Sequence, residues 1–176
     1  MLARFPCISR CLVAILLVGM YGPLVCAETS NEAALKTAFL FNFFKFIQWP
    51  VTADAFILCT TDNDGLGDSL DVLETKTIDD KPIIIQRGVV GKTLKNCQMV
   101  YISHPDNAAK IVRDLKGLAI VTVSDDPNFV DQGGVIGLVQ KDNRLGFEVN
   151  LDTANANGVH VMAQMLKLAK RVVAQK

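Results

Sequence analysis

The sequence predicts an α/β fold of the Rossmann-like kind, a three-layer sandwich with helices on both faces of a mainly parallel sheet that includes a C-terminal hairpin. One observation is that short runs with apolar centres recur along the chain, at residues 55–60, 81–86, 98–103 and 118–123. The other is that segments with helical spacing separate several of these runs. Strands buried on both faces form such continuous apolar runs, whereas strands with one solvated face alternate polar and apolar residues.

The first 27 residues have the features of a secretory signal peptide. Arg4 and Arg10 are followed by an apolar run, and the segment ends in Val25-Cys26-Ala27. Such a run is too short to span a bilayer comfortably, and a small-residue cleavage pattern follows it. We therefore expect export with cleavage after Ala27. The alternative is a lipoprotein acylated at Cys26, although Val25 is larger than the residue that lipoprotein processing usually requires.

Residues 28–176 have the size of one ordinary domain, with ample apolar content for a hydrophobic core. We expect a single α/β domain. The whole chain carries 18 basic and 18 acidic side chains, and no basic run occurs in it. This balance argues against nucleic acid as a partner.

The first predicted helix runs from Asn31 to Gln48. Thr29 and Glu32 have capping-box spacing at its start, and Pro50 ends it. At 100° per residue, one broad arc of this helix is apolar and is expected to face the core. That arc contains Leu35, Phe39, Leu40, Phe43, Phe44, Phe46 and Ile47.

The other side of this helix carries two more aromatic residues. Phe41 and the only tryptophan, Trp49, lie there beside Asn42, Lys45 and Gln48. Aromatic side chains among polar ones belong either to a second packing surface or to a surface that binds a partner. Exposure decides between these interpretations, because only exposed rings are available to a partner.

Helical spacing returns at three later places. Leu66, Leu70 and Leu73 predict a helix after Gly65, and a further helix is expected from about Asn107 to Leu115. A long last helix is predicted from about Asp152, with one apolar stripe. The stripe contains Val159, Met162, Leu166, Ala169 and Val173. Before it, residues 134–139 and 145–150 predict a hairpin around a polar turn at 141–143.

Two cysteines remain after the expected cleavage, Cys59 and Cys97. An even pair in an exported chain indicates a disulfide. The alternative is a pair of buried free thiols in neighbouring strands. A metal site is disfavoured, because the scattered His104 and His160 lack the spacing of ligand pairs.

No catalytic, cofactor-binding or metal-binding set is recognisable. Gly65-Leu66-Gly67 lacks the third glycine of a dinucleotide motif, and Asp62-Asn63-Asp64-Gly65 lacks later ligands of a calcium loop. The sequence also has no Gly-x-Ser-x-Gly elbow around a nucleophile. We therefore expect a protein that is not an enzyme and has no cofactor, with an exported enzyme as the remaining alternative.

Three polar residues of the predicted last hairpin strand share one side. Arg144, Glu148 and Asn150 are separated by even numbers of residues, and side chains alternate along a strand. A salt bridge or a cap on the following helix accounts for such residues in an apolar strand. The alternative is a recognition patch, which makes Arg144, Glu148 and Asn150 candidate contacts for a partner or ligand, together with Phe41 and Trp49.

Several motifs together resemble one known family. They are the aromatic segment 38–50, Gly133-Gly134-Val135-Ile136-Gly137, the segment Arg144–Asn150, Met165-Leu166-Lys167-Leu168-Ala169, and the pair Cys59 and Cys97. In order and spacing they are similar to the motifs of the YfiR family of small exported proteins. The likeness covers essentially all of residues 28–176.

This resemblance implies a periplasmic regulator that inhibits a membrane-bound diguanylate cyclase through the cyclase's periplasmic sensor domain. Such inhibition controls cyclic di-GMP signalling and biofilm formation. The resemblance also implies sequestration by an OmpA-like outer-membrane lipoprotein, homodimers, and tuning by disulfides. The present chain lacks a second cysteine pair that the best-known members have, so redox sensing through that pair does not carry over.

A second function fits the same residues. The chain is then a small-ligand-binding or sensor component for another signalling protein, such as a histidine kinase, with Trp49 and the strand of Glu148 lining a pocket. Fluorescence of Trp49 distinguishes the two functions, because a ligand in such a pocket changes the surroundings of the indole.

Overall fold

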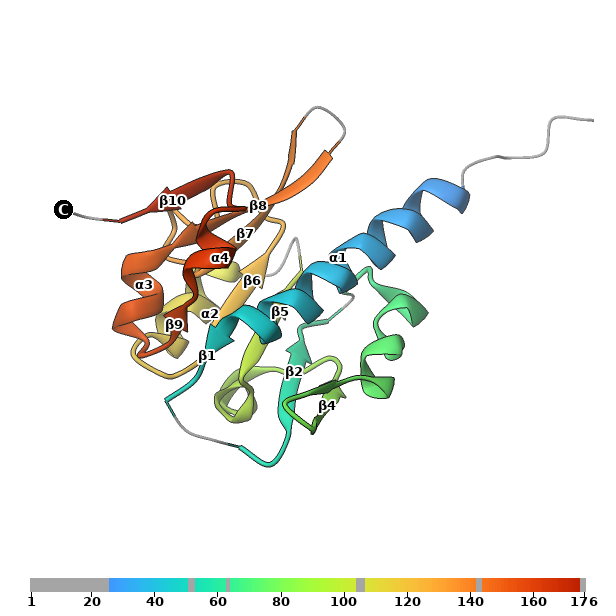
Figure 1. Ribbon diagram of the computed structural model, residues 1–176, viewed down its shortest axis with the longest axis horizontal. Coiled ribbons are helices and arrows are strands. Elements are labelled where there is room, and N and C mark those ends of the chain that lie inside the picture. Colours follow the sequence, from blue (N-terminus) through green and yellow to red (C-terminus); the bar gives the residue numbers. More distant parts are fainter. Residues whose placement is uncertain (1–25, 51–52, 63, 104–106, 142–143, 175–176) are drawn as a thin grey trace, which may run out of the picture.

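The computed structural model describes residues 26–50, 53–62, 64–103, 107–141 and 144–174. The predicted cleavage site falls at the boundary of this range, and most of the predicted signal peptide lies outside it. The domain is built around a central sheet, with helical segments on both faces (Figure 1). The α/β sandwich predicted from the sequence is therefore confirmed.

Eight strands of the described residues form the main sheet, in the order β10-β8-β7-β6-β5-β2-β4-β3. Their bounds are β2 (Phe56–Thr60), β3 (Thr77–Ile78), β4 (Lys81–Gln86), β5 (Met99–Ile102), β6 (Val121–Ser124), β7 (Ile136–Lys141), β8 (Arg144–Asn150) and β10 (Arg171–Val173). Strands β4, β2, β5, β6 and β7 are parallel to one another. The sheet is therefore mainly parallel, as predicted.

The C-terminal side of the sheet departs from this parallel pattern. Strands β7 and β8 form the predicted antiparallel hairpin, with Ile136 opposite Val149 and Lys141 opposite Arg144. Strand β10 then adds a parallel neighbour to β8, with Arg171 opposite Glu148. At the other end of the sheet, β3 pairs antiparallel with β4. Both outer strands are short, which leaves little exposed edge.

One face of the sheet is covered by α1 (Cys26–Phe46) together with η1 (Gly67–Ser69), η2 (Asp71–Thr75) and α4 (Ala163–Leu166). The helix α1 buries Leu40, Phe43 and Phe44 in the larger hydrophobic core. Phe39 and Phe46 pack against this core while staying partly exposed. These residues confirm that the predicted apolar arc faces the sheet.

The prediction that Leu35 is buried is wrong, since 45% of this residue is exposed. Ala33 and Thr37, on either side of Leu35, are 8% and 2% exposed, so this part of α1 is packed against the protein. Leu35 therefore points away from the buried side of the helix. Helical periodicity groups the apolar residues on one arc, but it does not define which part of that arc meets the sheet.

The first helix also ends earlier than predicted. Ile47 and Gln48 form the short strand β1, which pairs antiparallel with β9 (His160–Val161). The N–H of Met162 donates to the carbonyl of Phe46 at 2.9 Å. Residues 160–162, more than a hundred residues further along the chain, thus form the backbone hydrogen bonds that would otherwise belong to another turn of α1.

After β2, the predicted helix is replaced by the two 3₁₀ segments η1 and η2. Leu66, Leu70 and Leu73 are nevertheless buried in the α1 core, so the predicted apolar positions are right and the helix type is wrong. Gly65 and Gly67 have φ of +66° and +52°. Such left-handed backbone breaks a continuous α-helix at its start.

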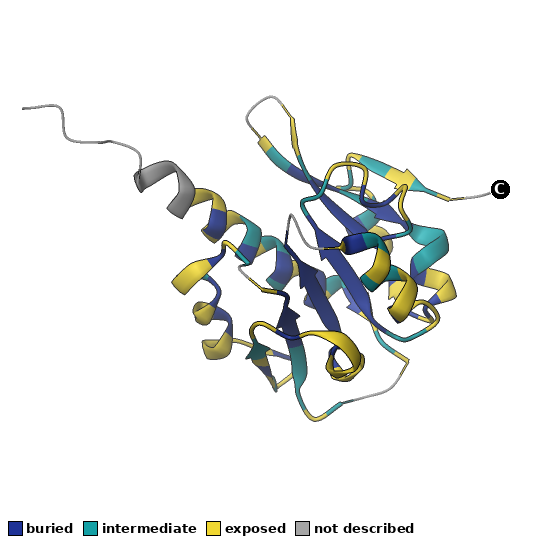
Figure 2. Cartoon of the chain, turned by 180° about the vertical axis from the view of Figure 1, so that it is seen from behind, coloured by how far each residue is buried: buried dark blue, intermediate teal, exposed yellow. Residues whose placement is uncertain are grey.

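The opposite face carries η3 (Gly91–Asn96) and α2 (Ala108–Leu115). The helix α2 begins close to the predicted position, with the side chain of Asn107 accepting from the N–H of Lys110 at 3.1 Å. These elements cover a second, smaller core, seen from behind in Figure 2 as buried strands beneath partly exposed helical segments. This core contains Cys59, Val89, Leu94, Cys97, Val100, Ile102, Ala108, Leu115, Ile120 and Phe129.

The predicted long last helix is wrong. The chain instead forms α3 (Leu151–Ala156), β9, α4 and β10. The helix α3 ends in a Schellman motif, in which the N–H groups of Gly158 and Val159 donate to the carbonyls of Asn155 and Ala154 at 2.9 and 3.0 Å. Gly158 has a φ of +73°, which a residue with a Cβ adopts only with strain.

Candidate functional site

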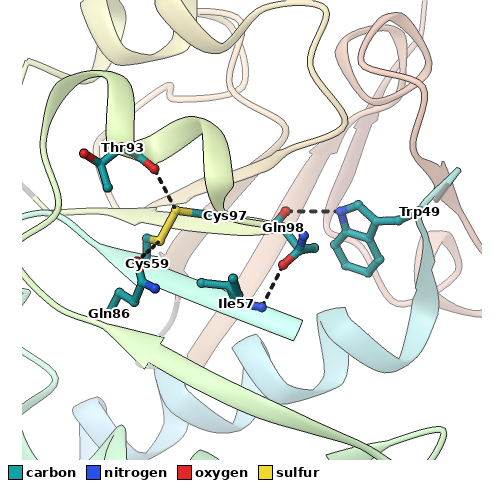
Figure 3. The surroundings of a disulfide bond; sticks show 7 residues. All are labelled: Trp49, Ile57, Cys59, Gln86, Thr93, Cys97 and Gln98. Atoms are coloured by element: carbon teal, nitrogen blue, oxygen red, sulfur yellow. Dashed lines mark hydrogen bonds between the residues drawn. A yellow bond between two sulfur atoms is a disulfide. The ribbon is translucent and has the colours of Figure 1, made fainter. Parts of the chain in front are cut away.

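The disulfide joins β2 to the residue that follows η3 (Figure 3). The Sγ atoms of Cys59 and Cys97 are bonded at 1.97 Å, and the two Cα atoms are 5.9 Å apart. Both residues are buried. The predicted pairing is therefore present, and the alternative of two free thiols does not apply.

Gln98, the residue after Cys97, connects Trp49 to the surroundings of this disulfide. The indole Nε1–H donates to the backbone carbonyl of Gln98 at 3.2 Å. The side-chain Oε1 of Gln98 accepts from the N–H of Ile57 at 2.8 Å (Figure 3). Gln98 therefore ties the end of the aromatic segment to β2, immediately beside the crosslink.

Two aromatic rings hold the indole of Trp49 on its other sides. The ring centroids of Phe44 and Phe56 both lie 5.7 Å from that of Trp49. Trp49 is half-buried as a result. The indole is thus fixed in place by its N–H and by its neighbours, with part of its surface left uncovered.

The uncovered part of Trp49 lines a cavity of about 350 Å³. Its walls combine aromatic and apolar groups with two lysines and one aspartate. The lining residues are Phe44, Lys45, Ile47, Gln48, Trp49, Ala53, Phe56, Ile78, Asp79, Lys81 and Met162. The lining is as polar as it is apolar, whereas small-molecule sites are usually mostly apolar with a few polar groups.

Phe41 is also half-buried, and it packs against the larger core. The Nζ of Lys45 lies 5.6 Å from the centroid of its ring, which is a cation–π contact. Phe41 and Trp49 are therefore neither fully exposed nor fully buried. Their role in contacting a partner stays a prediction.

Glu148 forms part of a charged cluster on β8 and β10. Its Oε2 accepts from Nη2 of Arg171 at 2.6 Å. Arg171 also donates to both carboxylate oxygens of Asp131, at 2.8 and 2.7 Å. These hydrogen bonds hold the pKa of Asp131 below its ordinary value and raise the pKa of Arg171. Glu148 thus has a salt-bridge partner, which was one of the explanations predicted for a charged residue in this strand.

Asn150 is buried and uses both ends of its amide. Its Oδ1 accepts from the N–H of Thr153 at 2.9 Å, which caps α3. Its Nδ2 donates to the carbonyl of Val130 at 2.8 Å. Asn150 therefore positions α3 relative to the neighbouring loop.

Arg144 lies at the other end of β8, exposed and opposite Lys141 in the hairpin. The face that it shares with Glu148 is basic at this end, because the side chain of Lys170 lies against Gly146. The recognition patch of Arg144, Glu148 and Asn150 stays a prediction.

The structure does not bring Trp49 and the strand of Glu148 into one pocket. Strands β7, β6 and β5 lie between β8 and β2. Because neighbouring strands are separated by roughly 4.8 Å, β8 and β2 are about 19 Å apart across the sheet. Trp49 and Glu148 therefore belong to two separate candidate surfaces.

Sequence reasoning missed an ion-paired cluster where α1 crosses the carboxyl ends of the strands. The Nζ of Lys36 lies 2.6 Å from Asp125 and 2.7 Å from Glu32. Burial opposes the charged form of Lys36, but these two hydrogen-bonded acids raise its pKa. Burial also raises the pKa of Tyr101, and the nearby Asp125 adds to that effect. The sequence did contain a signal for this cluster: Lys36 lies among the apolar residues of α1, where a charged side chain needs an acidic partner.

The segment that resembles a calcium loop has its carboxylate occupied by protein groups. Asp64 accepts from the hydroxyl of Thr60, the N–H of Leu66 and the guanidinium of Arg87, each at 2.8 Å. Arg87 also bonds Asp71 at 2.6 Å. Within the described ranges, no group of three or more His, Cys, Asp or Glu residues is arranged to hold a metal ion.

Comparison with known protein families adds the decisive observation. The model of the YfiR/HmsC-like family matches residues 33–170, which include most of α1, the disulfide and β8. The chain belongs to the YfiR/HmsC-like family. This membership supports a periplasmic regulator of cyclic di-GMP signalling that interacts with a membrane signalling partner. None of the helices in the described residues is long and apolar enough to span a membrane.

Proposed function

We propose that this chain inhibits a membrane-bound diguanylate cyclase by binding the cyclase's periplasmic sensor domain, and so lowers cyclic di-GMP in the cell. The observation that supports this function is the family match over residues 33–170. In this proposal the chain is exported, loses residues 1–27, and acts by binding rather than by catalysis. A homodimer and an OmpA-like outer-membrane lipoprotein that sequesters it belong to the same proposal.

Two surfaces are available for the cyclase. One is the outer side of α1 around Phe41, where a half-buried ring lies beneath Lys45. The other is the charged edge of the sheet, where Glu148 pairs with Arg171 and Arg144 is exposed. Charged groups at the rim of an interface mainly set specificity and the association rate, whereas a buried aromatic anchor contributes more to affinity.

The first experiment tests the function in the cell. Deleting the gene is expected to raise cyclic di-GMP and increase biofilm, because the cyclase is released from inhibition. Restoring the gene on a plasmid is expected to return both to their starting values. Unchanged cyclic di-GMP in a host whose candidate cyclase is intact would contradict inhibition.

The second experiment separates the surfaces with purified protein and the periplasmic domain of the candidate cyclase. Glu148→Gln and Phe41→Ala are each expected to weaken binding. Asp131→Asn is the matched control for Glu148, because it removes the other carboxylate paired with Arg171. If Asp131→Asn weakens binding as much as Glu148→Gln, the effect comes from disturbing Arg171 and not from a contact made by Glu148.

The cavity beside Trp49 favours a second candidate function, a small-ligand sensor for another signalling protein. Its aromatic walls and the charges of Lys45, Asp79 and Lys81 suit a small molecule with an apolar body and a polar group. Because Trp49 is the only tryptophan, its fluorescence reports on this cavity alone. An emission spectrum unchanged by periplasmic metabolite fractions would contradict a ligand site at this position.

A further inference from the structure

A second cavity lies between α2 and α3, away from both candidate surfaces described above. Its volume is about 320 Å³. It is lined by Val112, Arg113, Leu115, Lys116, Thr122, Gln132, Gly133, Asp152, Thr153, Ala156 and Asn157. Small-molecule sites have volumes from about 300 to 1,000 Å³, so this cavity suits a small ligand.

The walls of this α2–α3 cavity are held in place by hydrogen bonds. The amide of Asn157 accepts from the N–H of Gly117 at 2.9 Å and donates to the carbonyl of Ile120 at 3.0 Å. The hydroxyl oxygen of Thr122 accepts from the N–H of Val135 at 3.1 Å. The loop before β6, the end of α3 and the sheet are therefore tied together around the cavity, which is largely pre-formed.

The charges in the lining define the class of ligand. Arg113 and Lys116 are exposed cations on and just after the last turn of α2, and neither forms an ion pair with another described residue. Asp152 supplies the one carboxylate of the lining and has an interaction of its own. The formal charge of the lining residues is therefore +1, which a single negative charge balances better than the double charge of a phosphate monoester.

The rest of the lining is apolar or neutral. Val112, Leu115 and Ala156 offer hydrocarbon surface. Within the described residues, nothing accepts the hydroxyl hydrogen of Thr122. We propose that the cavity between α2 and α3 binds a small organic carboxylate, with its anionic group at Arg113 and Lys116 and its hydrocarbon part against Val112 and Ala156. This site is separate from the cyclase-binding surfaces and does not depend on the proposed function.

The test is a titration of the isotope-labelled periplasmic form of the chain, followed by two-dimensional NMR. Sodium hexanoate and sodium benzoate are the probes, hexanamide is the neutral counterpart, and inorganic phosphate is the second anion. We expect the carboxylates to shift the amide signals of residues 112–116 and 152–157, with at least tenfold weaker binding of hexanamide and phosphate. Shifts of equal size with hexanamide would overturn the role of the charge.

Variants then locate the charge. Arg113→Gln and Lys116→Gln are each expected to weaken benzoate binding about tenfold, which corresponds to about 1.4 kcal/mol. Lys110→Gln is the matched control, because Lys110 lies on the same helix, carries the same charge and pairs with Asp114 at 2.7 Å outside the cavity. An equal loss in Lys110→Gln, tighter binding of phosphate than of benzoate, or no shift with either carboxylate would overturn the proposal.

Discussion

The two faces of the sheet are stabilised in different ways. On the α1 face, large aromatic side chains interlock, and the rings of Phe39 and Phe43 meet that of Phe147 at centroid distances of 5.7 and 5.3 Å. On the α2 face, short helical segments cover a smaller core that contains the disulfide between Cys59 and Cys97. One face thus depends mainly on buried apolar area, and the other adds a covalent crosslink.

This difference teaches how each face offsets its open space, because both faces have a cavity. On the α1 face, Phe43 and Phe44 of the helix are fully buried, and a cavity of about 350 Å³ lies at the helix end beside Trp49. The α2 face has an eight-residue helix and a 3₁₀ segment, with a cavity of about 320 Å³ between α2 and α3. Interlocking rings offset the open space on the first face. On the second, a crosslink lowers the entropy of the unfolded chain and needs no extra packing.

The largest effect is expected from truncating a ring on the α1 face. Phe43→Ala removes a side chain that is 1% exposed, and we expect the free energy of unfolding to fall by about 3–5 kcal/mol. Urea denaturation followed by circular dichroism measures this loss. Phe41→Ala is the control, because Phe41 is only half-buried, and its loss should be clearly smaller. Equal losses would contradict the assignment of α1's inner and outer sides.

Breaking the crosslink on the α2 face is expected to cost somewhat less. Cys59 and Cys97 are 38 residues apart, and closing such a loop gives about 4 kcal/mol on the chain-entropy model, with about 2–4 kcal/mol typically measured. The measurement is urea denaturation of the Cys59→Ser/Cys97→Ser double variant.

The same disulfide variant also tests whether the two faces are independent. Distant mutations usually add within about 0.5 kcal/mol. Adding Phe43→Ala should therefore lower stability by the same amount with or without the crosslink. A clearly non-additive loss would show that the disulfide and the aromatic core stabilise each other.

A smaller effect is expected at the link between the faces. Trp49→Phe removes the hydrogen bond to the carbonyl of Gln98, which still accepts from the N–H of Val121 at 2.9 Å. Because that carbonyl keeps a partner, the expected cost is about 1 kcal/mol. Thermal or urea unfolding measures it. A loss as large as that of Phe43→Ala would mean that the indole, and not the α1 core, holds the aromatic segment in place.

The smallest effect is a pH dependence at the edge of the sheet. Arg171 lowers the pKa of Asp131 from its ordinary value of 3.8, so the ionised carboxylate is favoured in the folded chain. Its contribution is complete above pH 3.8 and disappears as the pH falls through the lowered pKa. Stability of the native chain should therefore decline more between about pH 4 and pH 2 than that of Arg171→Gln.

Salt provides the check on this pH effect. Asp131 and Arg171 are solvent-exposed to a large degree, and exposed ion pairs are weak and screened. The difference between the native chain and Arg171→Gln should shrink when the acid titration is repeated at high ionic strength. An unchanged difference would contradict an origin in the exposed pair of Asp131 and Arg171.

Much of the sheet could be predicted because its signals are local. The run Lys81–Gln86 coincides with β4, and the predicted hairpin strands 134–139 and 145–150 correspond closely to β7 and β8. The disulfide followed from counting the cysteines that remain after the predicted signal-peptide cleavage. Burial of Leu40, Phe43 and Phe44 followed from helical periodicity. The end of α3 before Gly158 was not predicted, because the apolar stripe of the predicted last helix continues past it.

The candidate surfaces were only partly predictable. The sequence singled out Phe41, Trp49 and Glu148, but not their partners Lys45, Gln98 and Arg171. The α2–α3 cavity was not foreseen at all, since its walls come from α2, β6 and α3 and carry no shared motif. Contacts between segments far apart in the chain depend on how the layers of the fold pack together. The local spacing of residues does not specify them.

The sequence by itself determined that this chain has an α/β fold, an aromatic core helix and one disulfide, because each depends on residue types and spacing that act locally. Only the tertiary structure decided where α1 stops, how residues 151–173 are divided, and which charged groups meet. Strand β9 captures the end of α1, and β8 recruits β10, through hydrogen bonds between segments far apart in the chain. Such contacts form only when the layers are assembled, so no local pattern specifies them.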